Sequence, residues 1–159
     1  MNKKTHRTVF FFSLQEYQCQ CRHNTCGPLC NQCCPMYNQK LWRPGKFISA
    51  NECERCQCFG HADECFFDPQ VEAERKSLNT EGQFEGGGVC LDCRHHTAGI
   101  NCQYCKQGYY RPTDVSQFDP RPCLPCQCQG IQGSLGTCYN NAEAEKLGVS
   151  PGQCVGFEN

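Results

Sequence analysis

Cysteine is the residue type in this chain that could carry chemistry. The sequence holds 19 cysteines in 159 residues, about one in eight, a density typical of disulfide-stapled secreted domains. Five pairs of cysteines are separated by two residues, at positions 30/33, 53/56, 90/93, 102/105 and 123/126. When oxidised, such cysteines form structural bridges. When reduced, two such pairs, with His61, His95 and His96 nearby, could instead hold zinc.

Three features favour disulfides over zinc. Cys-x-Cys recurs at positions 19/21, 56/58 and 126/128, and the whole spacing repeats along the chain. Cys26 and Cys34 are added to one copy of the repeat together, as a matched pair. An isolated extra pair serves a disulfide scaffold and adds nothing to a zinc site. We therefore predict no metal and no cofactor, with an intracellular zinc-binding module as the less favoured alternative.

The composition argues against a large apolar core, a nucleic-acid-binding surface and a membrane span. The mean hydropathy is −0.64, and the chain has a single tryptophan beside 15 glycines and 9 prolines. Such a chain buries too little apolar surface to fold by packing alone, so cross-links must stabilise it. The net charge of −1 comes with no basic stripe for nucleic acid. No apolar stretch approaches the roughly 20 residues of a membrane span.

No catalytic site is predicted. A nucleophilic Cys–His or Ser–His–Asp arrangement needs free side chains, and nearly every cysteine here is required for a bridge. His23, His95 and His96 each stand in a short cysteine-bounded loop, where a surface-turn role is expected. The glycines at 86–88 predict positive φ angles and close backbone approach. Residues Pro69–Leu78 are the best helix candidate, with Asp68 as the cap, although a solvated loop also fits.

The chain contains an internal repeat. A shift of 72 residues aligns cysteines 21, 30 and 33 with 93, 102 and 105, and a shift of 70 aligns 53, 56 and 58 with 123, 126 and 128. The intervening residues follow, since CRHNTCG (21–27) matches CRHHTAG (93–99). The repeat predicts a complete unit at 56–125, the second half of a unit at 19–55 and the first half of another at 126–159. Residues 1–18 are expected to be a non-family leader or a gene-model artefact.

These residues resemble the laminin-type EGF-like module, in particular the modules near the start of a laminin alpha chain's short arm. The complete unit has eight cysteines in that family's order, with its TAG turn at Thr97-Ala98-Gly99 and its GYY stretch at Gly108-Tyr109-Tyr110. CRHNTCGPLCNQCCPMYNQKLWRP, with its doubled cysteine, resembles the alpha-chain version of a module. The resemblance implies a small disulfide-rich fold of tandem modules stacked as a rod, with short two-stranded ladders and little other regular structure.

The resemblance also implies a pairing, which the sequence alone leaves open among 105 possibilities for eight cysteines. Pairing first with third, second with fourth, fifth with sixth and seventh with eighth gives Cys56–Cys65, Cys58–Cys90, Cys93–Cys102 and Cys105–Cys123. The partial units would contain Cys21–Cys30, Cys33–Cys53, Cys126–Cys138 and Cys128–Cys154. The extra cysteines, at the positions of Ala98 and Lys106 in the complete unit, are expected to form Cys26–Cys34. Cys19 is then left unpaired, and we attribute this to truncation of a longer chain.

The function that this resemblance implies is structural. The chain is expected to be secreted into the extracellular matrix of basement membrane, as a semi-rigid spacer of a laminin alpha-like chain that supports matrix assembly, cell adhesion and tissue development. Its expected partners are other laminin chains and basement-membrane proteins, reached through regions outside this fragment. A netrin-like secreted guidance ligand uses similar modules and is the alternative, although the Cys26/Cys34 pair argues against it.

Overall fold

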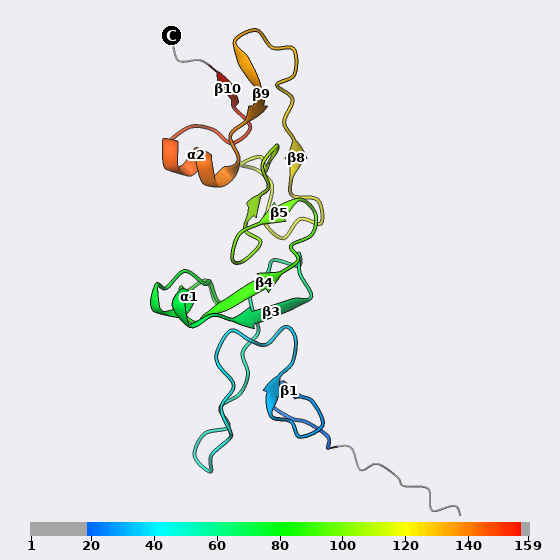
Figure 1. Ribbon diagram of the computed structural model, residues 1–159, viewed down its shortest axis with the longest axis vertical. Coiled ribbons are helices and arrows are strands. Elements are labelled where there is room, and N and C mark those ends of the chain that lie inside the picture. The colour runs from blue at the N-terminus through cyan, green and yellow to red at the C-terminus, as the bar shows by residue number, and fades with distance from the viewer. Residues whose placement is uncertain (1–18, 157–159) are drawn as a thin grey trace, which may run out of the picture.

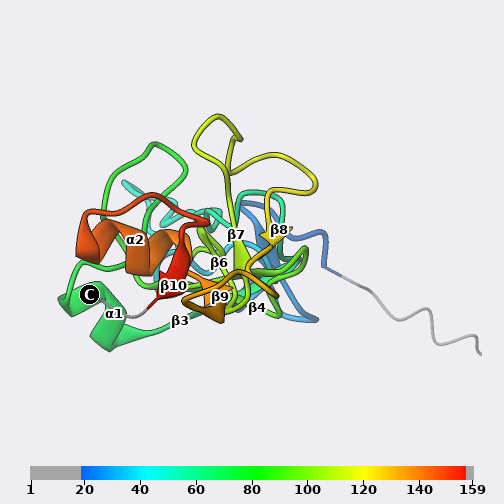
Figure 2. The ribbon, with the colours of Figure 1, turned by 90° about the horizontal axis from the view of Figure 1, so that it is seen from above.

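The computed structural model describes residues 19–156, so the expectation for residues 1–18 lies outside the described part. These residues form an elongated rod in which successive segments of the chain follow one another along the long axis (Figure 1). The two helices, α1 (Pro69–Ala73) and α2 (Asn141–Leu147), lie on the same side of the rod when it is seen end-on (Figure 2). The predicted stacking of units into a rod is confirmed.

Regular structure consists mainly of short two-stranded antiparallel ladders, as predicted. The pairs are β1 (Thr25–Cys26) with β2 (Gln32–Cys33), β3 (Glu64–Phe67) with β4 (Gly88–Leu91), β5 (Thr97–Ala98) with β6 (Tyr104–Cys105), β7 (Tyr109–Tyr110) with β8 (Leu124–Pro125), and β9 (Ser134–Cys138) with β10 (Cys154–Gly156). Cysteines occupy at least one strand in four of these five ladders. The sulfur bridges therefore hold ladders too short to be stable by themselves.

The internal repeat is visible in the backbone. Thr97 Oγ1 donates a hydrogen bond of 2.6 Å to the carbonyl of Arg94, and Thr25 makes the same bond of 2.6 Å to Arg22. The two residues before each threonine adopt positive φ angles between 57° and 61°, and they are His23, Asn24, His95 and His96. This left-handed backbone is costly outside glycine, so the flanking bridges and the threonine bond must hold it.

Helix α1 begins as predicted and ends earlier. Asp68 Oδ1 accepts from the backbone amides of Gln70 at 2.8 Å and Val71 at 3.3 Å, and Pro69 occupies the first helical position. The helix covers Pro69–Ala73 instead of reaching Leu78. Arg75 has φ +51°, a left-handed conformation that terminates an α-helix. The predicted extent was therefore wrong.

Helix α2 was not predicted, although its start carries a recognisable signal. Asn140 Oδ1 accepts from the Glu143 amide at 2.9 Å, and Glu143 Oε2 accepts from the Asn140 amide at 3.0 Å. This reciprocal capping box satisfies two backbone donors at the helix start. Gly148, with φ +67°, ends the helix in the left-handed conformation that glycine tolerates best.

The core of the complete unit consists mainly of disulfide-bonded cysteines. Its buried cluster consists of Cys56, Cys58, Ala62, Cys65, Cys90 and Cys102. Large apolar side chains lie mostly outside, with Phe47 and Ile48 fully exposed at 107% and 91%. The apolar core is thus too small to define the fold, and the framework of bridges must do so.

Candidate functional site: the joints between units

Sulfur–sulfur bonds join eighteen of the cysteines. They link Cys21–Cys30, Cys26–Cys34, Cys33–Cys53, Cys56–Cys65, Cys58–Cys90, Cys93–Cys102, Cys105–Cys123, Cys126–Cys138 and Cys128–Cys154. Within the described residues Cys19 has a free, exposed thiol. These pairs are the ones that the resemblance implies, and their formation in the expressed protein stays a prediction. No bridge crosses from one predicted unit to the next, so other contacts must fix the joints.

At the first joint, residues 35–39 of the first unit lie against the complete unit. The Cys56 amide donates to the Met36 carbonyl at 2.8 Å, and the Cys65 amide donates to the Pro35 carbonyl at 2.8 Å. The Gly87 amide donates to the Gln39 carbonyl at 2.9 Å. The backbone of one unit is therefore hydrogen-bonded to three separate positions in the next, which opposes bending at this joint.

The Gln39 side chain is fully enclosed at this joint, with 0% exposure. Its Nε2 donates to Ser77 Oγ at 3.0 Å and to the Glu85 carbonyl at 2.7 Å. Ser77 Oγ in turn donates to the Gly88 carbonyl at 2.7 Å. A buried amide whose donors are satisfied by another unit fixes the position of that unit, because separation would leave these polar groups unpaired.

Two of the three glycines at 86–88 make room for Gln39. A Cβ atom at Gly86 would lie 2.5 Å from the Gln39 carbonyl oxygen, and one at Gly88 would collide with Gln39 Oε1 and lie 2.7 Å from Cys56 Sγ. Gly86 also has φ +100°. The predicted close backbone approach at 86–88 is thus present, whereas the positive φ occurs at Gly86 alone among the three.

A surface ion pair reinforces the first joint. Lys40 Nζ lies 2.9 Å from Glu54 Oε1 and 3.1 Å from Glu85 Oε1, and it connects the end of one unit to the next. The hydrogen bond to Glu54, followed by that to Glu85, raises the pKa of Lys40. Because all three groups are well exposed, this cluster adds little beyond orientation, and water and salt weaken it.

At the second joint, helix α2 is fastened to the complete unit. The Arg111 amide donates to Asn141 Oδ1 at 2.8 Å, and Asn141 Nδ2 donates back to the Arg111 carbonyl at 2.9 Å. Gln107 Nε2 donates to Glu143 Oε1 at 2.6 Å. The capping box that starts α2 therefore also aims two of its first-turn side chains at the preceding unit.

The second joint repeats the construction of the first. The Cys126 amide donates to the Gly108 carbonyl at 2.9 Å, which corresponds to the bond from Cys56 to Met36. A glycine again permits close contact, since a Cβ atom at Gly152 would lie 2.6 Å from the Tyr110 ring. Both joints thus combine a cysteine amide, a side-chain amide and a close glycine. Only two residues separate Cys53 from Cys56 and Cys123 from Cys126, so the linkers allow little movement between units.

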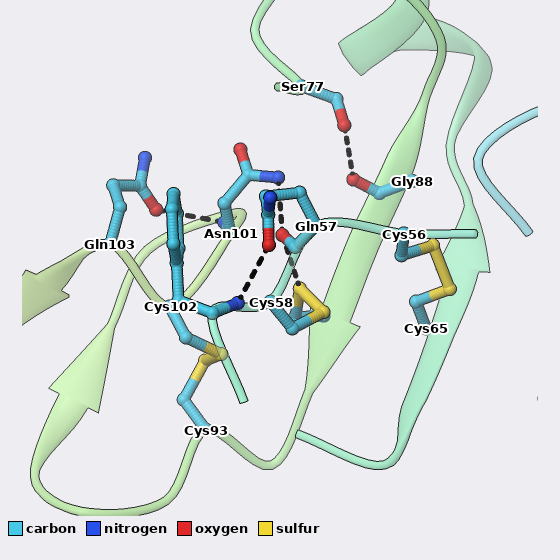
Figure 3. The surroundings of a disulfide bond; sticks show 12 residues. Cys56, Gln57, Cys58, Cys65, Ser77, Gly88, Cys93, Asn101, Cys102 and Gln103 are labelled. Carbon is cyan, nitrogen blue, oxygen red and sulfur yellow. Dashed lines mark hydrogen bonds between the residues drawn. A yellow bond between two sulfur atoms is a disulfide. The ribbon is translucent and has the colours of Figure 1, made fainter. Parts of the chain in front are cut away.

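A buried asparagine supports the middle of the complete unit. Asn101, 1% exposed, donates through Nδ2 to the Gln57 carbonyl at 2.8 Å and to the Leu78 carbonyl at 3.0 Å. Its Oδ1 accepts from the Leu78 amide at 3.0 Å. Figure 3 shows Asn101 beside the sulfur bridges, with the Ser77–Gly88 bond nearby. Asn101 fixes Leu78 within the segment between β3 and β4, residues 68–87, which carries Gly86 and Gly87.

The histidines have structural partners. His61 is buried, its Nε2 lies 2.7 Å from the Gln117 carbonyl, and its Nδ1 lies 2.8 Å from His95 Nδ1. The Nε2 nitrogen, which faces a carbonyl, must carry hydrogen, and across the short Nδ1–Nδ1 contact one of the two rings donates to the other. Burial, aided by the charges of His95 and Arg94, lowers the pKa of His61. His96 stacks on Tyr109 with ring centroids 4.1 Å apart.

Aromatic side chains lie close to both joints. Tyr110 packs between units, and Phe67 lies against Gly87 beside the first joint. Phe66, by contrast, is 43% exposed. Within residues 19–156 no three His, Cys, Asp or Glu side chains gather where they could hold a metal ion, and no helix there has the length and apolar character to span a bilayer.

Sequence reasoning missed Gln39, Ser77 and Asn141, which fasten the joints, and Asn101, which supports the complete unit. Their partners lie 11 to 46 residues away in the chain, and no local pattern reports such bonds. The glycine triplet was the one signal that pointed to the first joint, and the Asn140–Glu143 capping spacing could have pointed to the second.

Comparison with known proteins agrees with this architecture. The laminin EGF domain profile matches residues 6–53 and 56–123. The chain is 49% identical over 142 residues to the human laminin subunit alpha-1, 47% identical over 128 residues to the human laminin subunit alpha-3, and 46% identical over 110 residues to the laminin subunit alpha of Drosophila melanogaster. These matches cover 88%, 77% and 69% of this chain but only 5%, 4% and 3% of the relatives. The chain therefore belongs to the laminin EGF domain family.

Proposed function

We propose that this chain is a semi-rigid extracellular spacer of a laminin alpha-like protein, which contributes to basement-membrane assembly, cell adhesion and tissue development without catalysing a reaction. The observation that carries this proposal is the construction of the joints. At both of them hydrogen bonds and glycine contacts join the units, and a chain fastened in this way transmits position along its length. The similarity to laminin alpha subunits supports the assignment over a netrin-like ligand.

The proposal includes the oxidised state. Nine bridges formed as in the pairs above, each stabilising by about 2–4 kcal/mol through restriction of the unfolded chain, would place the protein outside the cell, because the cytosol keeps thiols reduced. Partners would be other laminin chains and basement-membrane proteins, bound through parts of a longer protein. The predicted boundaries at 19–55, 56–125 and 126–159 define the units of this spacer.

Stiffness is the property to measure. Residual dipolar couplings of the secreted, isotopically labelled chain should fit a single alignment tensor for all three units, and small-angle scattering should give the profile of one extended rod. The reduced and alkylated chain is the control. Separate tensors for residues 19–55 and 56–125 in the oxidised protein would contradict the spacer function.

Sulfur chemistry is tested separately. Proteolysis under non-reducing conditions followed by mass spectrometry should recover the nine pairs, and the denatured protein should show one thiol and no zinc. Stoichiometric zinc together with many thiols would support the intracellular zinc-binding module instead.

A further inference from the structure

A groove of about 770 Å³ lies beside the second joint, between the segment that follows α1 and helix α2. Its walls include Arg75 and Lys76 from the segment after α1, together with Arg111 and with Glu145 of α2. The spacer role requires no such groove, and the contacts that fasten the second joint do not fill it.

The floor of the groove is apolar and held in place. Leu78, Ile100, Tyr104 and Phe84 line it, and Phe84 has 60% of its surface exposed. Asn101 binds both the amide and the carbonyl of Leu78. A floor fixed by buried hydrogen bonds needs no reorganisation to accept a ligand, which favours binding.

The walls carry more positive than negative charge. Among residues 19–156, neither Arg75 nor Arg111 forms an ion pair with a carboxylate, while Lys76 is paired with Glu74. Arg111 Nη1 donates to the Gln103 carbonyl at 3.0 Å, which fixes a half-buried guanidinium beside the groove. Burial lowers the pKa of Arg111, so a carboxylate bound there would gain from an already desolvated cation.

We propose that this groove binds an acidic peptide segment of a partner protein, with a carboxylate on Arg111 and Arg75 and an aromatic or aliphatic side chain on Leu78 and Phe84. The apolar floor distinguishes this occupant from a sulfated glycan, which would use a row of cations and leave Phe84, Leu78 and Ile100 uncovered. The single opposing carboxylate, Glu145, would limit affinity for an acidic ligand.

The test uses the intact oxidised chain and a fluorescein-labelled Glu-Phe-Glu-Phe-Glu peptide, followed by anisotropy and by amide chemical shifts. Binding with a Kd of about 0.1 mM or tighter is expected, with shifts at Leu78, Ile100 and Tyr104. Peptides with Gln in place of Glu, or Ala in place of Phe, should bind about tenfold more weakly.

Variants distinguish binding in the groove from nonspecific binding through surface charge or exposed apolar side chains. Arg111→Gln and Phe84→Ser should each weaken binding about tenfold, whereas Arg111→Lys should retain most of it. Arg121→Gln and Phe47→Ser, which alter exposed residues away from the groove, should change it less than about twofold. Amide spectra and thiol counts establish that each variant is folded.

Three results would overturn the proposal. These are no binding of the acidic peptide at about 1 mM, equal losses in the Arg111 and Arg121 variants, or displacement of the peptide by a sulfated oligosaccharide that itself depends on Arg111. A gain in affinity for Glu145→Gln would support it, because that substitution removes the carboxylate that competes with the ligand for the cations.

Discussion

The Gln39→Ala variant tests whether side-chain hydrogen bonds, and not bridges alone, fix one unit on the next. The substitution removes the Nε2 bonds to Ser77 Oγ and the Glu85 carbonyl. Each lost bond costs about 1 kcal/mol, and the void left in a site of 0% exposure costs about 1 kcal/mol more. The sum is about 3 kcal/mol, and the small alanine side chain makes no new contact that would offset this loss.

This destabilisation should be local, because the bridges on either side of the joint are unaffected. We therefore expect the joint to open while each unit stays folded. About 3 kcal/mol raises the population of the open joint about a hundredfold, so the Gly87 amide, which donates to the Gln39 carbonyl, should exchange with deuterium about a hundredfold faster.

Native-state hydrogen exchange read by NMR is the measurement, with Gln70→Ala as the matched control. Gln70 is exposed, and among residues 19–156 its side chain bonds only to Glu74, at 3.0 Å. Amides remote from the joint, such as Tyr139, should exchange equally in all variants. If Gly87 and Cys56 exchange in Gln39→Ala as slowly as in Gln70→Ala, the side chain does not hold the joint and the reasoning fails.

Four further predictions concern other residues. Gly88→Ala should lower the stability of the first joint by roughly 1–3 kcal/mol, because its new methyl group collides with the neighbouring unit; unchanged exchange protection there would contradict this. The lowered pKa of His61 means that the unfolded state binds more protons, so thermal stability should fall as the pH drops below about 6.5 and level off below the lowered pKa. Calorimetry of the wild type and His61→Gln tests this, and equal pH dependence would refute it. Asn141→Ala removes two bonds to the Arg111 backbone, and should give the third unit its own alignment tensor in dipolar-coupling measurements. Cys19 should be the single residue labelled by a thiol reagent in the native chain, and labelling of a second cysteine would show an open bridge.

Cysteine spacing made the overall architecture predictable. The eight-cysteine frame identified the repeat, the family and the short ladders, because covalent distance constraints act through positions that a sequence displays directly. The turn at 21–27 and its copy at 93–99 share the same positive φ angles for that reason.

Local signals were less complete. Asp68 and Pro69 predicted the start of α1, but no residue at 74–78 indicated the left-handed backbone conformation of Arg75 that ends it. Helix α2 was not predicted, although Asn140 and Glu143 have capping-box spacing, because a helix of seven residues is too short to display a clear apolar period. The bonds of Gln39 depend on a neighbouring unit's fold and leave no mark on nearby sequence.

The bridges stabilise each unit, whereas the joint contacts orient neighbouring units, and this difference has a consequence for the order of the modules. The cysteine frame is shared by units of this family, whereas Gln39 fits a partner that has glycines at the positions of Gly86 and Gly88, just before its fourth cysteine. The joint residues of adjacent units are therefore specific to one another. Exchanging units by recombination would give units that fold normally but no longer pack against their neighbours at a fixed angle.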